Sequence, residues 1–300
     1  RSHSKGVVDN HMKIQTNVSP VISAANLKAI LNDDHLVIFD CRFSLASPAS
    51  GMTEYETAHI PSSRYLHLDR DLSGPMGNGE FGRHPLPDPD HFASSMASKG
   101  VDDDSLVVAY DDSGAAFASR LWWMMKWLGH EAVSVLDGGW RAWLTANGAV
   151  QSSISPHEKS TFTRNEITPL LASATELLDQ DVNLIDSRSA ERYAGEAEPI
   201  DPVAGHIPGA VNRPWMQNLN EDGKFLSPGQ LRARFTDLDL SNQTIFYCGS
   251  GVTACHNILA TQIAGLPMPQ LYAPSWSGWI SDETRPVERA EGARAASSTR

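Results

Sequence analysis

The segment that decides the fold is Ile-Phe-Tyr-Cys-Gly-Ser-Gly-Val-Thr-Ala-Cys, residues 245–255. Its first three residues are apolar and predict the end of a buried strand, whereas apolar residues from Val252 onward recur at the spacing of a helix. Cys248 therefore lies where a strand gives way to a helix. There its sulfur faces loop N–H groups and the positive end of the helix dipole, which both favour a thiolate. Because the thiolate is the reactive form of cysteine, Cys248 is the candidate nucleophile.

The residues after Cys248 fit a functional loop. Gly249 and Gly251 let the backbone fold tightly around the sulfur, and Ser250 and Thr253 add hydroxyl donors. The alternative is a buried structural cysteine, but such a residue needs neither the two glycines nor the two hydroxyl groups.

Short motifs occur twice along the chain in the same order, which indicates two copies of one domain. In each copy, apolar runs such as 36–39, 106–109 and 133–136 alternate with helical stretches such as 117–128. This alternation predicts an α/β fold in which a mainly parallel sheet is flanked by helices. The repeated motifs are Asp-Cys-Arg (40–42) with Asp-Ser-Arg (186–188), His-Ile-Pro at 59–61 and 206–208, Tyr-Asp (110–111) with Tyr-Cys (247–248), and Trp140 with Trp276.

Composition limits the classes of function. The chain has 300 residues, 41% of them hydrophobic, which suffices for two cores, and it has no run long and apolar enough to cross a membrane. A net charge of −12 argues against nucleic acid as a partner. Cysteines occur only at positions 41, 248 and 255, so we expect no disulfide framework and a reducing, cytoplasmic location.

The pattern of polar and turn-rich stretches divides the chain. We expect residues 1–11 to be a tag remnant, 18–147 an N-terminal domain, 148–168 a linker, 169–287 a C-terminal domain and 288–300 a disordered tail. A long loop over 73–90 contains four glycines and four prolines, and loops of this length are usually functional or disordered. We favour a functional loop.

The segment 248–253 resembles the active-site loop of two-domain sulfurtransferases of the rhodanese superfamily, in particular the branch that uses 3-mercaptopyruvate. The resemblance covers roughly residues 20–287 and implies tandem rhodanese-like domains. The other motifs that carry it are His-Ile-Pro (59–61), Gly-His-Ile-Pro-Gly-Ala (205–210), Leu-Asp-Gly-Gly-Trp (136–140) and Ser-Trp-Ser-Gly-Trp (275–279).

The resemblance implies a mechanism. Cys248 would take sulfur from the donor, become a persulfide and release pyruvate, and then pass the sulfur to cyanide or to a thiol acceptor such as a small thiol or a thioredoxin-like protein. No metal or organic cofactor is required. The first domain has Asp111 in place of Cys248. Since a carboxylate cannot carry sulfane sulfur, that domain is predicted to be catalytically silent and to help wall the site.

The resemblance also implies roles for further residues. Arg192 matches a substrate-binding arginine, Ser250 a residue that polarises the substrate or relays a proton, and Asp69 an aspartate placed with cysteine and serine in a proton relay. Arg188 is the next candidate for the donor carboxylate, although its counterpart Arg42 in the silent half favours a structural role. The loop residues expected to contact the substrate are Gly249, Gly251, Val252 and Thr253.

Donor preference follows from charge. Thiosulfate-preferring relatives have two cations after the cysteine, which match a dianion, whereas this chain has neutral Gly249 and Ser250. Enzymes of the mercaptopyruvate branch often carry a second arginine before Gly-His-Ile-Pro-Gly, but residues 196–203 contain none. Two alternatives therefore stay open, a thiosulfate:cyanide sulfurtransferase and a non-catalytic sulfur-carrier or interaction module.

Two other readings of the cysteine loop are disfavoured. A cysteine phosphatase of the related C-x5-R type would need an arginine at position 254, which is Ala254. Cys255 lies two helical turns from Cys248 and is expected to be a buried helix residue rather than a resolving thiol.

Overall fold

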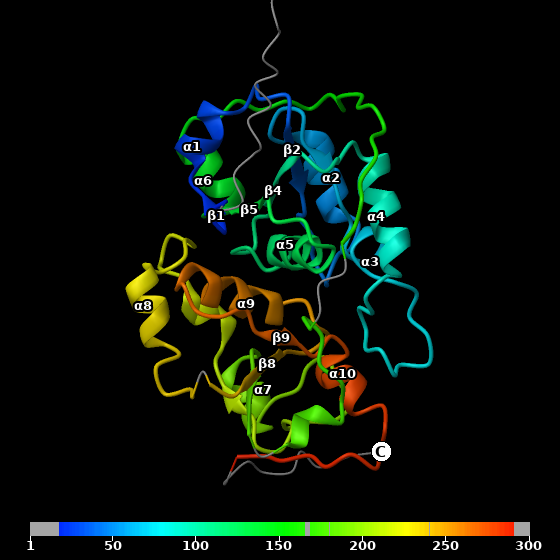
Figure 1. The fold of residues 1–300 in the computed structure, drawn as a ribbon, viewed down its shortest axis with the longest axis vertical. Coiled ribbons are helices and arrows are strands. Elements are labelled where there is room, and N and C mark those ends of the chain that lie inside the picture. The colour runs from blue at the N-terminus through cyan, green and yellow to red at the C-terminus, as the bar shows by residue number, and fades with distance from the viewer. Residues whose placement is uncertain (1–17, 166–168, 180, 240, 291–300) are drawn as a thin grey trace, which may run out of the picture.

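A computed structural model describes residues 18–165, 169–179, 181–239 and 241–290. The segment expected to be a tag remnant lies outside the described residues. The described chain forms two α/β domains, one above the other in Figure 1. Each has a wholly parallel sheet, in the order β1-β5-β4-β2-β3 in the first domain and β7-β6-β8-β9 in the second. The α/β fold and the parallel sheets predicted from the sequence are therefore confirmed.

The elements of the first domain follow the predicted alternation. Its strands are β1 (Val21–Ile22), β2 (Leu36–Asp40), β3 (Arg64–Tyr65), β4 (Leu106–Tyr110) and β5 (Val133–Leu136). Its helices are α1 (Ala24–Ala29), α2 (Ser50–Thr57), α3 (Leu68–Asp71), α4 (Pro89–Ser98), α5 (Ala118–Trp127) and α6 (Gly139–Thr145). The central strands are almost wholly buried because helices cover both faces of the sheet, which explains their continuous apolar sequences.

The second domain repeats the plan on a smaller scale. Its strands are β6 (Val182–Asp186), β7 (Val211–Asn212), β8 (Gln243–Tyr247) and β9 (Gln270–Leu271). Its helices are α7 (Ala190–Ala194), α8 (Pro228–Ala233), α9 (Ala254–Ile263) and α10 (Ser275–Trp279), with 3-10 turns η1 (Glu176–Leu178) and η2 (Trp215–Asn218). In the described chain, no helix has the length and apolar character needed to cross a membrane.

The two copies agree in their hydrogen bonds. In the first copy the hydroxyl of Tyr110 accepts the backbone N–H of Ile60, and in the second that of Tyr247 accepts the N–H of Ile207. The carbonyl of Asp111 accepts the N–H of Trp140 at 2.8 Å, as that of Cys248 accepts the N–H of Trp276 at 2.9 Å. The motif pairs found in the sequence thus occupy equivalent places.

Helices α5 and α9 lie side by side between the two sheets and join the domains (Figure 1). One apolar cluster runs through this contact and includes Trp122 and Trp123 of α5 together with Ile258 and Leu259 of α9. Residues 122–125, Trp-Trp-Met-Met, therefore belong to the apolar core between the two domains. The two domains form one continuous packing unit around the site described below.

The C-terminal boundary differs from expectation. The tail expected over 288–300 begins with residues that lie on the second domain, because His206 and Glu288 exchange two backbone hydrogen bonds and Ala290 donates to the carbonyl of Ala194. The prediction of disorder is wrong for residues 288–290, and residues 291–300 lie outside the described part of the chain. The charged sequence of residues 288–290 gives no local sign of this strand-like pairing, because its partners are remote in the sequence.

Candidate active site

Cys248 lies directly after β8, and α9 begins six residues later. The N–H of Gly251 points at its sulfur, with 3.2 Å between N and Sγ. Gly251 has φ +78°, and a methyl group there would lie 2.3 Å from the carbonyl oxygen of Ala273, so only glycine fits this turn. The side chain of Cys248 is nearly buried, with 2% of its residue surface exposed. The strand, loop and helix predicted around the nucleophile are confirmed.

A cavity of about 540 Å³ reaches the sulfur and is built by both domains. The residues around it are Phe43, Ser44, Leu45, Ala46, Leu68, Arg83, His84, Ser113, Ala116, Phe117, Arg188, Ser189, Arg192, Ile200, Trp215, Cys248, Gly249, Ser250, Val252 and Thr253. Ten of these come from the first domain, seven of them from the loops after β2 and β4, so the first domain forms part of the cavity wall. Val252 and Thr253 of the cysteine loop lie in the wall.

A chain of polar contacts connects Ser250 to Asp69 through a residue that the sequence did not single out. The Oγ of Ser250 lies 2.7 Å from Nδ1 of His84, and Nε2 of His84 lies 3.3 Å from Oδ1 of Asp69. Since a carboxylate only accepts, His84 donates from Nε2, and its Nδ1 accepts the hydroxyl proton of Ser250. Ser250, His84 and Asp69 are thus ordered as a hydroxyl, an imidazole and a carboxylate.

The imidazole of His84 is held neutral. Burial, and to a smaller extent the nearby Arg120, lower its pKa to about 4 against the opposing effect of Asp69. Asp69 is half exposed, with 46% of its side chain accessible, so its contact with His84 is the weaker link. His84 comes from the long loop over 73–90, which the sequence marked as functional without indicating the residue.

Arg120 is an unusual neighbour of the sulfur. Its side chain is fully buried and donates to the backbone carbonyls of Gly251 at 2.8 Å, of His84 at 3.0 Å, and of Leu72 and Pro85. No carboxylate within the described chain forms an ion pair with it. Arg120 therefore ties the long loop of the first domain to the cysteine loop of the second, and its charge faces the thiol groups of Cys248 and Cys255.

Two arginines flank the loop at Gly249. A methyl group on Gly249 would lie 3.1 Å from a guanidinium nitrogen of Arg83 and 3.3 Å from one of Arg192. Arg192 comes from α7, whereas Arg83 comes from the long loop of the first domain. An arginine of the other domain thus lies beside Arg192 at the cysteine loop, although residues 196–203 contain none. Arg-His at 83–84 is the signal that could have pointed to both residues.

Arg188 is held in place by contacts within the second domain. Its guanidinium makes a two-oxygen pair with Asp186, donates to the carbonyl of Gly205 and stacks 4.7 Å from the ring of Trp276. Arg42 repeats this arrangement with Asp40 and Trp140 in the silent domain. The duplicated geometry favours a structural role, with one edge of Arg188 in the cavity wall.

Asp111 occupies the position in the first copy that Cys248 has in the second. Its carboxylate is buried and accepts four backbone N–H groups at 2.8–2.9 Å, from Ser113, Ala115, Phe117 and Ala118. Burial raises the pKa of Asp111 although these four bonds lower it. The anion-binding loop of the first domain is thus filled by its own carboxylate.

Cys255 is a buried helix residue, as expected. It is fully buried in α9, its thiol donates to the carbonyl of Gly251 at 3.4 Å, and burial raises its pKa to about 12. All three cysteines are free and buried.

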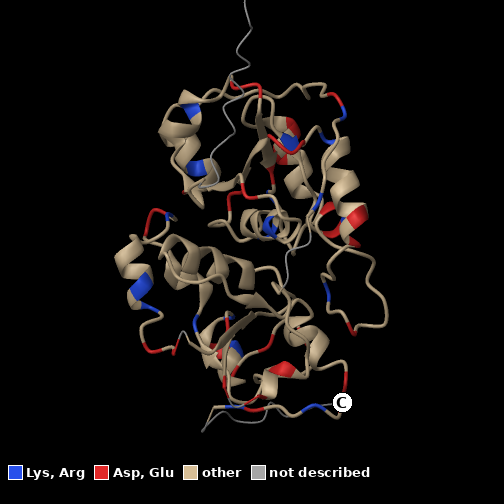
Figure 2. Cartoon of the chain, in the orientation of Figure 1, with Lys and Arg blue, Asp and Glu red and all other residues tan. Residues whose placement is uncertain are grey.

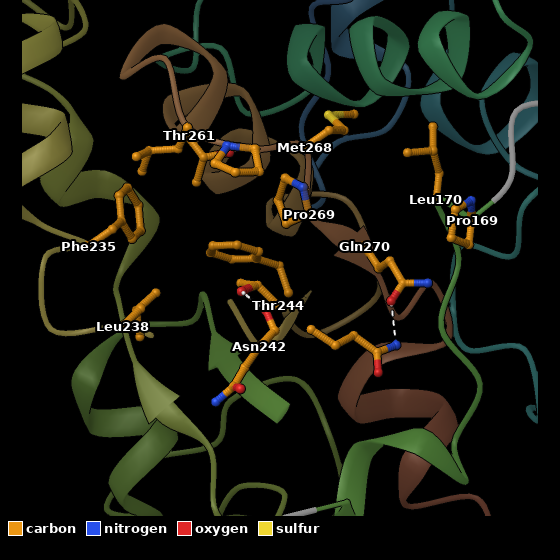
Figure 3. A pocket seen from close by; sticks show the side chains of 14 residues that line it. Pro169, Leu170, Phe235, Leu238, Asn242, Thr244, Thr261, Met268, Pro269 and Gln270 are labelled. Atoms are coloured by element: carbon orange, nitrogen blue, oxygen red, sulfur yellow. Dashed lines mark hydrogen bonds between the residues drawn. The ribbon is translucent and has the colours of Figure 1, made fainter. Parts of the chain in front are cut away.

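A second cavity, of about 360 Å³, lies at the other end of β8 and β9 and is shown in Figure 3. Its wall is made of apolar, amide and hydroxyl side chains, among them Phe235, Met268 and Gln270. The described residues around it include no ionisable side chain, and none of the predicted site residues lies there. The chemistry therefore belongs to the cavity at Cys248.

Charges are otherwise dispersed. In Figure 2, Lys and Arg positions alternate with Asp and Glu positions over both domains. Arg83, Arg120 and Arg192 nevertheless lie together near Cys248.

Comparison with known proteins agrees with this geometry. The model of the rhodanese-like domain matches the chain twice, at residues 23–146 and 171–282. The chain therefore belongs to the rhodanese family of sulfurtransferases. It is 45% identical, over 89% of its length and 97% of the relative's, to a probable 3-mercaptopyruvate sulfurtransferase of Pseudomonas aeruginosa. It is 36% identical, over 90% of its length and 96% of the relative's, to a putative thiosulfate sulfurtransferase of Mycobacterium tuberculosis.

Solved structures give the same result. The 3-mercaptopyruvate sulfurtransferase of Leishmania major aligns with a TM-score of 0.77 and 32% identity, covering 87% of this chain and 74% of that one. The enzyme SseA of Escherichia coli, also a 3-mercaptopyruvate sulfurtransferase, aligns with a TM-score of 0.76 and 28% identity, covering 86% of this chain and 99% of that one. The predicted tandem rhodanese fold and the predicted class of enzyme are confirmed.

Proposed function

We propose that this protein transfers sulfane sulfur from 3-mercaptopyruvate, through a persulfide on Cys248, to a thiol or to cyanide. The observation that carries the proposal is the cavity in which the nucleophilic cysteine, a Ser250–His84–Asp69 relay and two arginines converge. The relatives named for 3-mercaptopyruvate support this choice of donor.

The first half-reaction forms the persulfide. The Cys248 thiolate attacks the donor sulfur, the S–S bond forms, and the C–S bond breaks with its electron pair left on carbon as the enolate of pyruvate. The proton of the donor thiol moves to this enolate, so that the products are pyruvate and the deprotonated persulfide. Arg192 and Arg83 bind the donor carboxylate in this proposal, since guanidinium groups match the geometry of carboxylates.

The relay carries the proton in this scheme. A neutral imidazole whose Nδ1 already accepts from Ser250 can take a proton through that hydroxyl, and Asp69 stabilises the imidazolium formed. Ser250 then returns the proton to the enolate. The relay is needed only when the donor carries a thiol proton, which thiosulfate does not.

The second half-reaction returns the enzyme to its resting state. An acceptor thiolate attacks the outer sulfur, and the electron pair of the broken S–S bond returns to Cys248 as the thiolate. Because Cys248 is only 2% exposed, the acceptor has to be small or has to present its thiol on a narrow segment. A small thiol or a thioredoxin-like protein meets this condition.

We also propose the division of labour and the compartment. Residues 18–147 form the silent domain and residues 169–287 the catalytic one, joined by 148–168. Three free thiols suit a reducing compartment such as the cytoplasm.

Steady-state kinetics with 3-mercaptopyruvate and thiosulfate side by side, with cyanide as acceptor, tests the proposal. We expect the higher kcat/KM for 3-mercaptopyruvate. A higher value for thiosulfate would favour the name carried by the mycobacterial relative, and no turnover with either donor would favour a non-catalytic carrier.

A further inference from the structure

The two donor-site arginines are already paired with buried acids. The carboxylate of Asp201 holds Arg192 at 3.0 Å through one oxygen and Arg83 through the other. Glu198 holds Arg192 at 2.8 Å and also contacts Arg188 at 3.3 Å. Asp201 and Glu198 are 3% and 4% exposed, so solvent screens these pairs little. The acids come from the segment 196–203, which sequence analysis noted only for its lack of arginine.

The charges of the arginines that line the cavity are therefore balanced, whereas the buried Arg120 faces Cys248 and Cys255 and is not part of the cavity wall. Three arginines at the cavity, Arg83, Arg188 and Arg192, contact three carboxylates, Asp186, Glu198 and Asp201. A neutral group of this kind can still donate hydrogen bonds to an anion. It provides little net attraction, however, so a second negative charge on the donor gains little from binding and still loses its hydration.

We propose, building on the function above, that Asp201 selects the charge of the sulfur donor: by sharing its carboxylate between Arg83 and Arg192, it keeps the site neutral and so favours a monoanion over a dianion. Asp201 rather than Glu198 has this role because, within the described chain, its carboxylate forms hydrogen bonds only with the two donor-site arginines. Glu198 additionally accepts the backbone N–H groups of Ile200 and Asp201, and so also shapes the loop.

The test is the ratio of kcat/KM for thiosulfate, a dianion, to that for 3-mercaptopyruvate, a monoanion. Asp201→Asn keeps the shape of the side chain and adds one unit of positive charge. If the added charge lies about 7 Å from the donor and the effective dielectric constant is near 20, it strengthens donor binding roughly tenfold for each negative charge of the donor, with screening by salt included. We expect the ratio to rise by about tenfold, and the rise to shrink with added salt. Sulfate should likewise become a stronger competitive inhibitor relative to pyruvate.

Two controls keep the test specific. Asp237→Asn makes the same change in net charge at an exposed ion pair with Arg213, outside the cavity wall, and should leave the ratio unchanged. Asp201→Glu keeps the charge and should keep the wild-type ratio even if altered geometry lowers both rates. A ratio in Asp201→Asn within twofold of the wild-type value would overturn the proposal. Wild-type protein inactive with both donors would instead refute the proposed function.

Discussion

The proton relay predicts that His84 matters for one half-reaction and one kind of donor. We expect His84→Ala to lower kcat/KM for 3-mercaptopyruvate by about 10²- to 10⁴-fold, the usual contribution of a positioned general acid or base. The backbone carbonyl of His84, which accepts from Arg120, remains in the variant, so the loop keeps that anchor. Ser250→Ala should have a similar effect, because the 2.7 Å contact between Ser250 and His84 makes them one unit.

The loss of activity should be smaller for a change at Asp69 than for a change at Ser250 or His84. Asp69 is half exposed and lies 3.3 Å from His84, so Asp69→Asn should cost no more than about tenfold. The double variant lacking both Ser250 and His84 should be little worse than either single variant, since removing one member already stops proton transfer.

The assay separates the half-reactions. Pyruvate release reports persulfide formation, and the rate at which cyanide discharges a preformed persulfide reports the second step. His84→Ala should slow the first and leave the second within a few fold of wild type, because the donor proton has already moved. Equal losses in both steps, or equal losses with thiosulfate, would refute the relay and reduce His84 to a loop support.

Three further predictions concern binding and stability. Arg192→Ala should lower kcat/KM for 3-mercaptopyruvate by about 10- to 200-fold, with only partial recovery in Arg192→Lys; unchanged kinetics would mean that the carboxylate is bound elsewhere. Asp111→Ala should keep most activity but lower the free energy of unfolding by about 3 kcal/mol or more, measured in urea, because four buried N–H groups lose their acceptor; an unchanged midpoint would contradict this. Burial lowers the pKa of His84 to about 4 and that of His256 to about 3, both below the unfolded value near 6.5. The folded state therefore binds fewer protons, and stability should fall as the pH drops from about 6.5 towards 4; His256→Gln should weaken this dependence, and a flat profile would count against neutral histidines.

Most of the fold could be predicted from the sequence because the patterns that indicate its strands, helices and turns are local. The apolar runs of β2, β4 and β8 and the turn at Gly251 depend on neighbouring residues, and the repeated motifs tie the two halves to one plan. Cys248 and Ser250 were found for the same reason. Their loop is a single continuous segment.

The rest of the site depends on contacts across the domain interface, which no local pattern encodes. His84 and Arg83 reach Ser250 and Gly249 only because the long loop crosses to the other domain. Arg120 lies in a helix that is buried on nearly all sides, so its sequence resembles that of a core helix. The tail over 288–290 was likewise misjudged, because its partner His206 is remote in sequence.

The central claim is that Cys248 carries the sulfur. Intact-mass measurement of the protein treated with 3-mercaptopyruvate alone should show a gain of one sulfur atom, roughly 32 Da, that cyanide removes and that peptide mapping places on Cys248. Cys248→Ser, a nearly isosteric change, should fold normally and show no gain. An adduct that persists in Cys248→Ser, or that maps to buried Cys41 or Cys255, would contradict the account.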